Sequence, residues 1–233
     1  MTARSYLALT LWLQGETEQA LYQSEQAISE GEQLPHPISL ILPVGFSQWL
    51  HQMRADVDRT EATCDRSDQL GKDFGFPFWN AWTLTLRGWI QSARGDHAGA
   101  RQTIQDGVTQ WRASGTTAGC HYFYALLAES CLKDGDFEAA TLALDQAQSF
   151  ADETGERFYE AEILRLRGEI VLAIDPKQSQ VAADWFRRAI AFAEKQGTVA
   201  LKQRAVDSLS SLPHVASHPS EPPRGLTSED ALG

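Results

Sequence analysis

A turn that recurs every forty residues is the feature that most restricts the folds open to this chain. Gly-Asp occurs at 95–96 and again at 135–136, and the same step upstream gives Ala55-Asp56 and Gly15-Glu16. One step downstream stands Asp175-Pro176. A small residue or turn former followed by an acid, at a constant spacing, is typical of an array of repeated helical hairpins.

Between these turns the sequence predicts helices in pairs, because apolar residues recur at helical spacing, as Leu7, Leu11 and Trp12 do. The stretch 33–37 contains two prolines and separates the first pair from the second. A helix after the fifth pair has a polar outer side that suits a C-terminal cap. The predicted helices span about residues 6–14, 18–30, 38–53, 59–72, 78–94, 98–114, 117–133, 138–154, 157–173, 180–196 and 199–212.

The second helix of each pair has small residues where a partner helix must come close. Ala140, Leu144 and Ala147 lie on one helical face, and Ala182 with Ala189 flank Phe186 in the same way two helices later. One pair cannot hide such a stripe from water, so neighbouring pairs must cover it. The sequence therefore predicts an all-α, right-handed solenoid of five antiparallel helix pairs and a capping helix over 1–212, followed by a disordered tail over 213–233.

Composition excludes several classes of partner. The formal charge of −11 argues against nucleic acid, whose phosphates require clustered Lys and Arg. No apolar run is long enough to cross a membrane, and the first residues do not form a signal peptide. The three cysteines are scattered along the chain, which fits a reducing compartment. These features predict a cytoplasmic protein.

Several of these residues resemble the tetratricopeptide repeat family. Leu127-Ala128, Cys131, Gly135-Asp136 and the Ala140/Leu144/Ala147 triplet match in the fourth unit, and Leu7-Ala8, Leu11, Gly15, Ala20 and Ala27 match in the first. The period here is forty residues where the family usually has 34. Arg87 and Arg167 stand where the family pattern has Leu, just before Gly88 and Gly168, so the alignment of the third and fifth units stays open.

Longer strings resemble the C-terminal helical region of large bacterial signalling proteins. These strings are residues 75–77, 86–89, 127–129, 155–162 and 164–169. In that family an adenylate or guanylate cyclase domain, or sometimes a kinase or DNA-binding module, is joined to an AAA-type ATPase and then to the repeats. The resemblance implies that this chain corresponds to the partner-binding region, either as a fragment or as a stand-alone relative.

The sequence contains no catalytic signature. Nucleotide-binding glycine loops, the zinc-protease helix motif and the serine nucleophile elbow are all absent. Asp73-Phe74-Gly75 spells a kinase triplet without its companion motifs, and a turn explains it. Cys120, His121 and Cys131 lack the paired spacing of a zinc site and fit core packing. We therefore expect no enzyme activity, no cofactor and no metal.

The candidate site is instead the concave face of the array, which the first helix of each pair would line. Large aromatic side chains at the centre of such a surface can anchor a partner segment. Trp79, Trp111 and Trp185 are expected to pack between repeats. The residues predicted to face the groove are Trp12, Trp49, Trp82, Trp89, Tyr122, Glu129, Glu162, Arg165 and Glu169.

The sequence thus favours a scaffold that binds a protein or peptide in its groove, as the sensor or regulatory part of a bacterial signalling system. The alternatives are a relative of a cyclase or ATPase that lacks the catalytic motifs, or of a transcriptional regulator. An apolar edge is expected at the N-terminus, formed by Leu7, Leu9, Leu11, Trp12 and Leu13. That edge could join an upstream cyclase or ATPase module, or a second copy of the chain.

Overall fold

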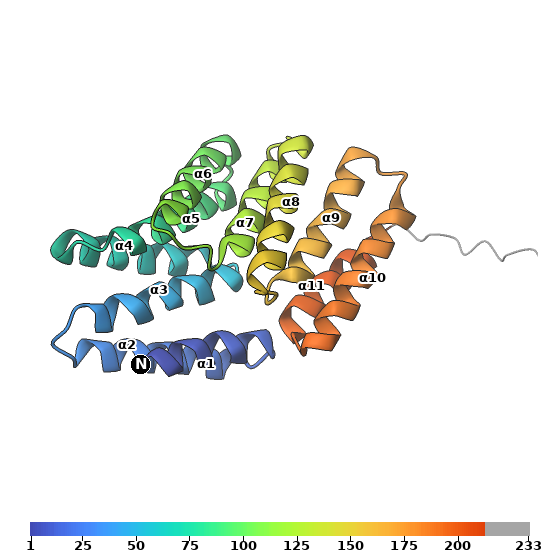
Figure 1. Ribbon diagram of the computed structural model, residues 1–233. Coiled ribbons are helices and arrows are strands. Elements are labelled where there is room, and N and C mark those ends of the chain that lie inside the picture. The colour runs from blue at the N-terminus through green and yellow to red at the C-terminus, as the bar shows by residue number, and fades with distance from the viewer. Residues whose placement is uncertain (213–233) are drawn as a thin grey trace, which may run out of the picture.

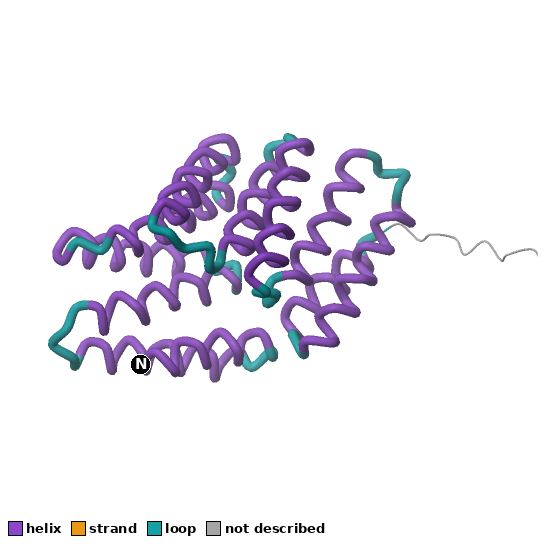
Figure 2. Tube along the Cα trace, viewed as in Figure 1, coloured by secondary structure: helices purple, strands orange, loops and turns teal. Residues whose placement is uncertain are grey.

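The computed structural model describes residues 1–212, so the tail predicted over 213–233 lies outside the described residues. The described part is an all-α solenoid of helix pairs, without a strand (Figures 1 and 2). Its helices are α1 (Thr2–Leu13), α2 (Thr17–Glu32), α3 (Ile38–Met53), α4 (Val57–Phe74), α5 (Pro77–Ala93), α6 (His97–Ala113), α7 (Cys120–Lys133), α8 (Phe137–Thr154), α9 (Glu160–Ile174), α10 (Ser179–Gln196) and α11 (Val199–Ser210).

The helices form an inner and an outer layer. The backbone of each odd-numbered helix lies close to that of the next odd-numbered one, whereas the even-numbered helices have their close backbone neighbours among the odd-numbered helices. The odd-numbered helices therefore surround the inner side of the array, and the even-numbered helices cover them from outside (Figure 1). No helix within residues 1–212 combines the length and the apolar character that crossing a bilayer requires.

Acidic caps explain why the turns recur. The side chains of Asp56, Asp96 and Asp136 each accept a hydrogen bond from the backbone N–H three residues later, at the start of α4, α6 and α8. Such a cap satisfies one of the free donors of a helix N-terminus. The residue before each cap has a positive φ, which glycine adopts without strain. In the second unit that residue is Ala55, with φ 54°.

The forty-residue step also fixes where paired helices come closest. A Cβ atom on Gly88 of α5 would lie 2.9 Å from the carbonyl oxygen of Ala100 in α6. A Cβ atom on Gly168 of α9 would lie 2.5 Å from the ring of Phe186 in α10. Both glycines therefore mark sites of close helix approach. Ala8 and Ala128, which are separated from these glycines by multiples of forty residues, are buried at the equivalent positions of other units.

Two arginines beside these glycines settle the alignment that the sequence left open. The Arg87 guanidinium lies 2.6 Å from Asp65 and 2.7 Å from Asp68, both on α4. Arg167 lies 2.9 Å from Asp145 on α8 in the same way. Each arginine thus points back to the outer helix of the preceding pair, and the glycine after it packs within its own pair.

The array curls until its last helix meets its first. α11 contacts α1 (Figure 1), and a Cβ atom on Gly15 would lie 3.2 Å from Val199. The guanidinium of Arg204 lies 5.6 Å from the ring centroid of Trp12. Within the predicted N-terminal edge, Leu9 is buried and Leu7 is exposed. The inner helices therefore close into a ring.

Candidate functional site

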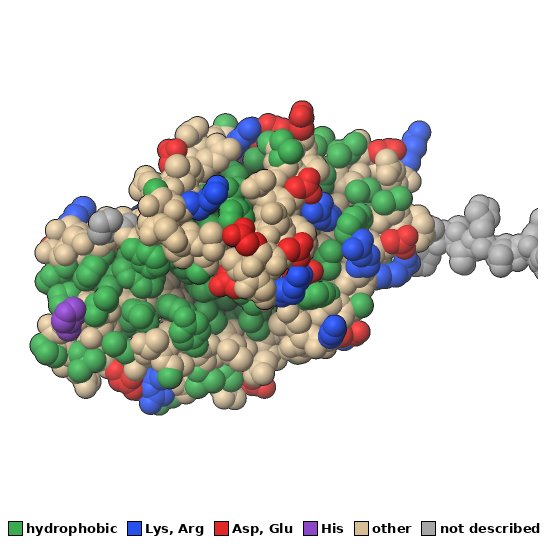
Figure 3. Space-filling view, in the orientation of Figure 1, with side chains coloured by type: hydrophobic (Ala, Val, Ile, Leu, Met, Phe, Trp, Pro, Cys, Tyr) green, Lys and Arg blue, Asp and Glu red, His purple; other side chains and the backbone are tan. Residues whose placement is uncertain are grey.

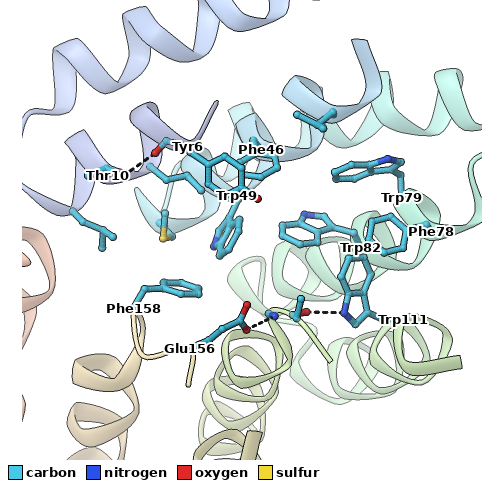
Figure 4. A pocket seen from close by; sticks show the side chains of 16 residues that line it. Tyr6, Thr10, Phe46, Trp49, Phe78, Trp79, Trp82, Trp111, Glu156 and Phe158 are labelled. Carbon is cyan, nitrogen blue, oxygen red and sulfur yellow. Dashed lines mark hydrogen bonds between the residues drawn. The ribbon is translucent and has the colours of Figure 1, made fainter. Parts of the chain in front are cut away.

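An apolar pocket of about 460 Å³ opens on the inner side of the array. Its walls come from α1, α3, α5 and α6 and from the loops before α7 and α9. Figure 3 shows a hollow, largely hydrophobic surface over α1 and α3, with acidic side chains beside it. The lining residues are Tyr6, Leu9, Thr10, Leu13, Leu42, Phe46, Trp49, Met53, Phe78, Trp79, Trp82, Trp111, Ala118, Gly119, Glu156 and Phe158 (Figure 4).

Trp49 stands at the centre of the aromatic walls. Its ring centroid lies 4.9 Å from that of Trp82 and 5.0 Å from that of Phe158, and both pairs are edge-on. Tyr122 packs behind it, with a centroid distance of 5.2 Å. Edge-to-face aromatic contacts of this kind add to the stability gained from burial. The walls are consequently held in place before any ligand arrives.

Two aromatic residues at the rim remain open to solvent. Tyr6 is 59% exposed and packs edge-on against Phe46, with centroids 4.7 Å apart. Phe78 is 38% exposed and lies 4.1 Å from Trp111. Exposed large aromatics above a buried aromatic floor offer apolar area that a partner could cover.

One carboxylate interrupts the apolar lining. Among residues 1–212, Glu156, in the loop before α9, is the only charged residue of the pocket lining. One of its oxygen atoms accepts a hydrogen bond from the Gly119 N–H at 2.8 Å and lies 3.4 Å from Nδ1 of the buried His121. The neighbouring imidazole, and then the backbone N–H, hold the pKa of the Glu156 carboxyl below its usual range.

The other end of the inner side is polar. Arg165 pairs with Glu162 at 2.7 Å and with Glu169 at 2.9 Å, and Ser208 of α11 donates to Glu169 at 2.7 Å. Although burial by itself raises the pKa of Glu162, the charges of Arg165 and Arg204 outweigh it and lower that pKa to about 2. A second cavity of about 340 Å³ opens here, lined by Gln52, Ala55, Trp89, Glu129, Tyr159, Glu162, Arg165, Arg204, Asp207 and Ser208.

Six of the nine residues predicted for the groove divide between these two regions. Trp49 and Trp82 line the apolar pocket, whereas Trp89, Glu129, Glu162 and Arg165 line the polar cavity.

Three predicted groove residues lie outside both linings. Glu169 is joined to the polar cavity through the hydrogen bonds that it accepts from Arg165 and Ser208. Trp12 lies under Arg204, and Tyr122 is fully buried, with its hydroxyl group donating to Gln52. Trp82 and Trp89 are each 5% exposed, so their rings form walls and do not project into the groove, and Trp12 is buried as well.

Several pocket residues escape the repeat pattern. Trp79 and Trp111 were expected only to pack between repeats, and both also line the pocket. Trp111 is 2% exposed, and its indole N–H donates to the Ala118 carbonyl oxygen at 2.8 Å. Phe158 comes from a loop, where a helical period gives no signal. Trp185 lies away from the pocket on α10, with the Arg188 guanidinium 4.1 Å from its ring centroid.

The thiols near His121 belong to the core. Cys120 and Cys131 are buried, and burial raises the pKa of each to about 11. Within residues 1–212 no three His, Cys, Asp or Glu side chains gather closely enough to hold a metal ion.

Comparison with known proteins agrees with this architecture. The tetratricopeptide repeat family model matches residues 1–22 and 81–106, which cover α1, most of α5 and the starts of α2 and α6. An uncharacterized protein of Rhizobium meliloti (strain 1021) is 26% identical over 206 residues, covering 88% of this chain. The chain spans 20% of the length of that relative. The matched segments and the helix pairs together support a tetratricopeptide-like repeat.

Proposed function

We propose that this chain is a non-catalytic scaffold that binds a segment of a partner protein on its inner side. The aromatic pocket carries the proposal, because it is large, apolar, formed in advance and open at its rim. Covering a Leu or Phe side chain there would contribute about 1.5–3 kcal/mol. Fixed aromatic walls lose little entropy on binding, which favours affinity.

Tyr6 and Phe78 are the residues best suited to test the pocket. Both line it and both are substantially exposed, so Tyr6→Ala and Phe78→Ala should leave the core intact. Trp82→Ala is less informative, because Trp82 is 5% exposed and packs against Trp49, Trp111 and Phe123. Its truncation would open a cavity and destabilise the fold.

The test begins with a random peptide library displayed on phage and selected on the immobilised chain. Selected peptides are then synthesised and titrated, with tryptophan fluorescence as the readout. We expect Tyr6→Ala and Phe78→Ala each to weaken binding about tenfold, or about 1.4 kcal/mol. Tyr22→Ala and Leu142→Ala serve as controls, because both residues are about as exposed as Tyr6 and more exposed than Phe78 but lie on α2 and α8 of the outer layer.

If the affinity for the selected peptides falls no further in the pocket variants than in the controls, the peptides bind elsewhere and the proposal is refuted. Melting temperatures of all four variants must accompany the titrations. A pocket variant that melts far below its control cannot be read as a binding defect, and Phe78→Leu then replaces Phe78→Ala at nearly constant volume.

We further propose that the scaffold is the regulatory part of a bacterial signalling protein. The length of the Rhizobium relative supports this role, since the matched region is a small share of it. A cyclase or ATPase relative is the alternative that the sequence left open. Assays of cyclic nucleotide formation and ATP turnover separate the two, because robust activity of this chain alone would contradict a pure scaffold.

A further inference from the structure

We infer that the segment held in the aromatic pocket carries a Lys or Arg side chain next to its apolar anchor, and that Glu156 pairs with it. The inference rests on the proposed function and specifies the chemistry of the partner. Three observations support it: Glu156 has no Lys or Arg partner among residues 1–212, one of its carboxylate oxygens accepts no hydrogen bond there, and aromatic rings line the same pocket.

Glu156 has no Lys or Arg partner in the part of the chain that the structure describes. Among residues 1–212, no Lys or Arg nitrogen lies within 4.0 Å of its carboxylate, and only His121 approaches it. By contrast, Glu162 at the polar end is paired with both Arg165 and Arg204, and Glu169 is paired with Arg165. Glu156 is therefore able to pair with a cation that a partner brings to the apolar pocket.

The Glu156 carboxylate is held in place through one of its two oxygen atoms. Both the Gly119 hydrogen bond and the His121 contact involve Oε2. Within the described part of the chain, Oε1 accepts no hydrogen bond, although the side chain is 36% exposed. Figure 4 shows the carboxylate beside Phe158, facing the aromatic cluster. Oε1 is thus an anchored acceptor at the wall of an apolar pocket.

The surrounding rings favour a cation over other occupants. The faces of Trp and Phe side chains carry negative partial charge and attract Lys and Arg groups within about 6 Å. Trp49, Trp82 and Phe158 line the pocket together with Glu156. A neutral apolar segment would cover the carboxylate without compensating its charge, which costs free energy. An acidic segment would also be repelled by a chain of net charge −11.

The experiment pairs a change in the peptide with a change in the protein. Each peptide selected on the native chain is resynthesised with its basic residue replaced by norleucine, which keeps the apolar stem and removes the charge. Both peptides are titrated against the native chain and against Glu156→Gln. The glutamine keeps an acceptor oxygen for the Gly119 N–H, and the melting temperature confirms that the variant is folded.

We expect norleucine to lower affinity about tenfold on the native chain and less than twofold on Glu156→Gln. Affinity of the basic peptide for the native chain should also fall as salt rises. Glu153→Gln is the matched control, because Glu153 is an exposed acid three residues away that does not line the pocket. That variant should retain the full tenfold difference.

The results separate this inference from the proposed function. Peptides that lose affinity with Tyr6→Ala but carry no basic residue, or that lose the same affinity to norleucine on both proteins, would overturn the inference and leave the scaffold standing. Peptides insensitive to both Tyr6→Ala and Glu156→Gln would overturn the two together.

Discussion

The guanidinium group of Arg204, in the last helix, donates a hydrogen bond to the backbone carbonyl oxygen of Met53, 151 residues earlier. Met53 is the last residue of α3, where helix carbonyls lack partners within the helix. The same group lies 3.4 Å from Glu162 and 5.6 Å from the ring centroid of Trp12. One side chain thus connects the C-terminal helix to α1, α3 and α9.

Arg204→Ala should destabilise the chain by roughly 2 kcal/mol, because it frees a helix carbonyl and removes one of two partners of the buried Glu162. Hydrogen exchange should accelerate selectively in α1 and α11, which meet at this contact. Lys202→Ala is the control on the same helix, since its ion pair with Glu194 is largely exposed. Equal melting temperatures of the two variants would show that Arg204 does not hold the ends together.

Glu162 predicts a specific acid sensitivity. Its pKa is about 2 in the folded chain, below the ordinary value of 4.5. A lowered folded pKa stabilises the native state above the unfolded pKa, and this contribution is lost as pH falls from about 4.5 to about 2. Urea unfolding at pH 7, 4 and 3 should show a decline that is shallower in Glu162→Gln, although that variant starts less stable. Parallel declines would refute the assignment.

Ala55 and Gly95 offer a matched test of the turn conformation. Both precede an aspartate cap, and both have positive φ, 54° and 97°. Ala55→Gly should stabilise the chain by up to about 1 kcal/mol, because relief of the left-handed strain exceeds the added freedom of the unfolded chain. Gly95→Ala should destabilise it by about 1 kcal/mol. Chemical denaturation measures both, and shifts of the same sign would contradict the explanation.

Gly88 should tolerate no side chain. Its added Cβ atom would lie 2.9 Å from a backbone oxygen and a backbone nitrogen of α6, which cannot move without shifting the helix. Gly88→Ala should therefore cost about 2–3 kcal/mol despite the better helix propensity of alanine. Gly168→Ala should cost less, because the atoms it meets belong to the side chain of Phe186. Thermal melting of the two variants tests this order.

Local features of the fold were predictable because they repeat along the sequence. The caps at Asp96 and Asp136 and the small residues at Ala140 and Ala147 reflect contacts within one unit or between neighbours. Such contacts depend on residues close in sequence. The helix bounds predicted from them differ from those of the structure by a few residues at most.

The pocket was predicted only in part, because its geometry depends on the curvature of the whole array. A small rotation per repeat, summed over the repeats, decides whether α11 reaches α1, and no single residue encodes that sum. Phe158 and Glu156 come from a loop, outside the helical period. The sequence predicted Trp82 to face the groove, whereas its packing against Trp111 and Phe123 makes its ring part of the pocket wall.

No single repeat of the array forms the pocket by itself. Its lining runs from Tyr6 to Phe158 and draws on four successive units. Many solenoids gain or lose a unit by duplication or deletion and keep their binding surface in shortened or lengthened form. Here the removal of forty residues would pull apart the rings around Trp49 and separate the two ends that meet at Arg204. The number of units in this array is therefore tied to its binding chemistry. Insertion of a whole repeat would disrupt the pocket unless the residues that line it changed as well.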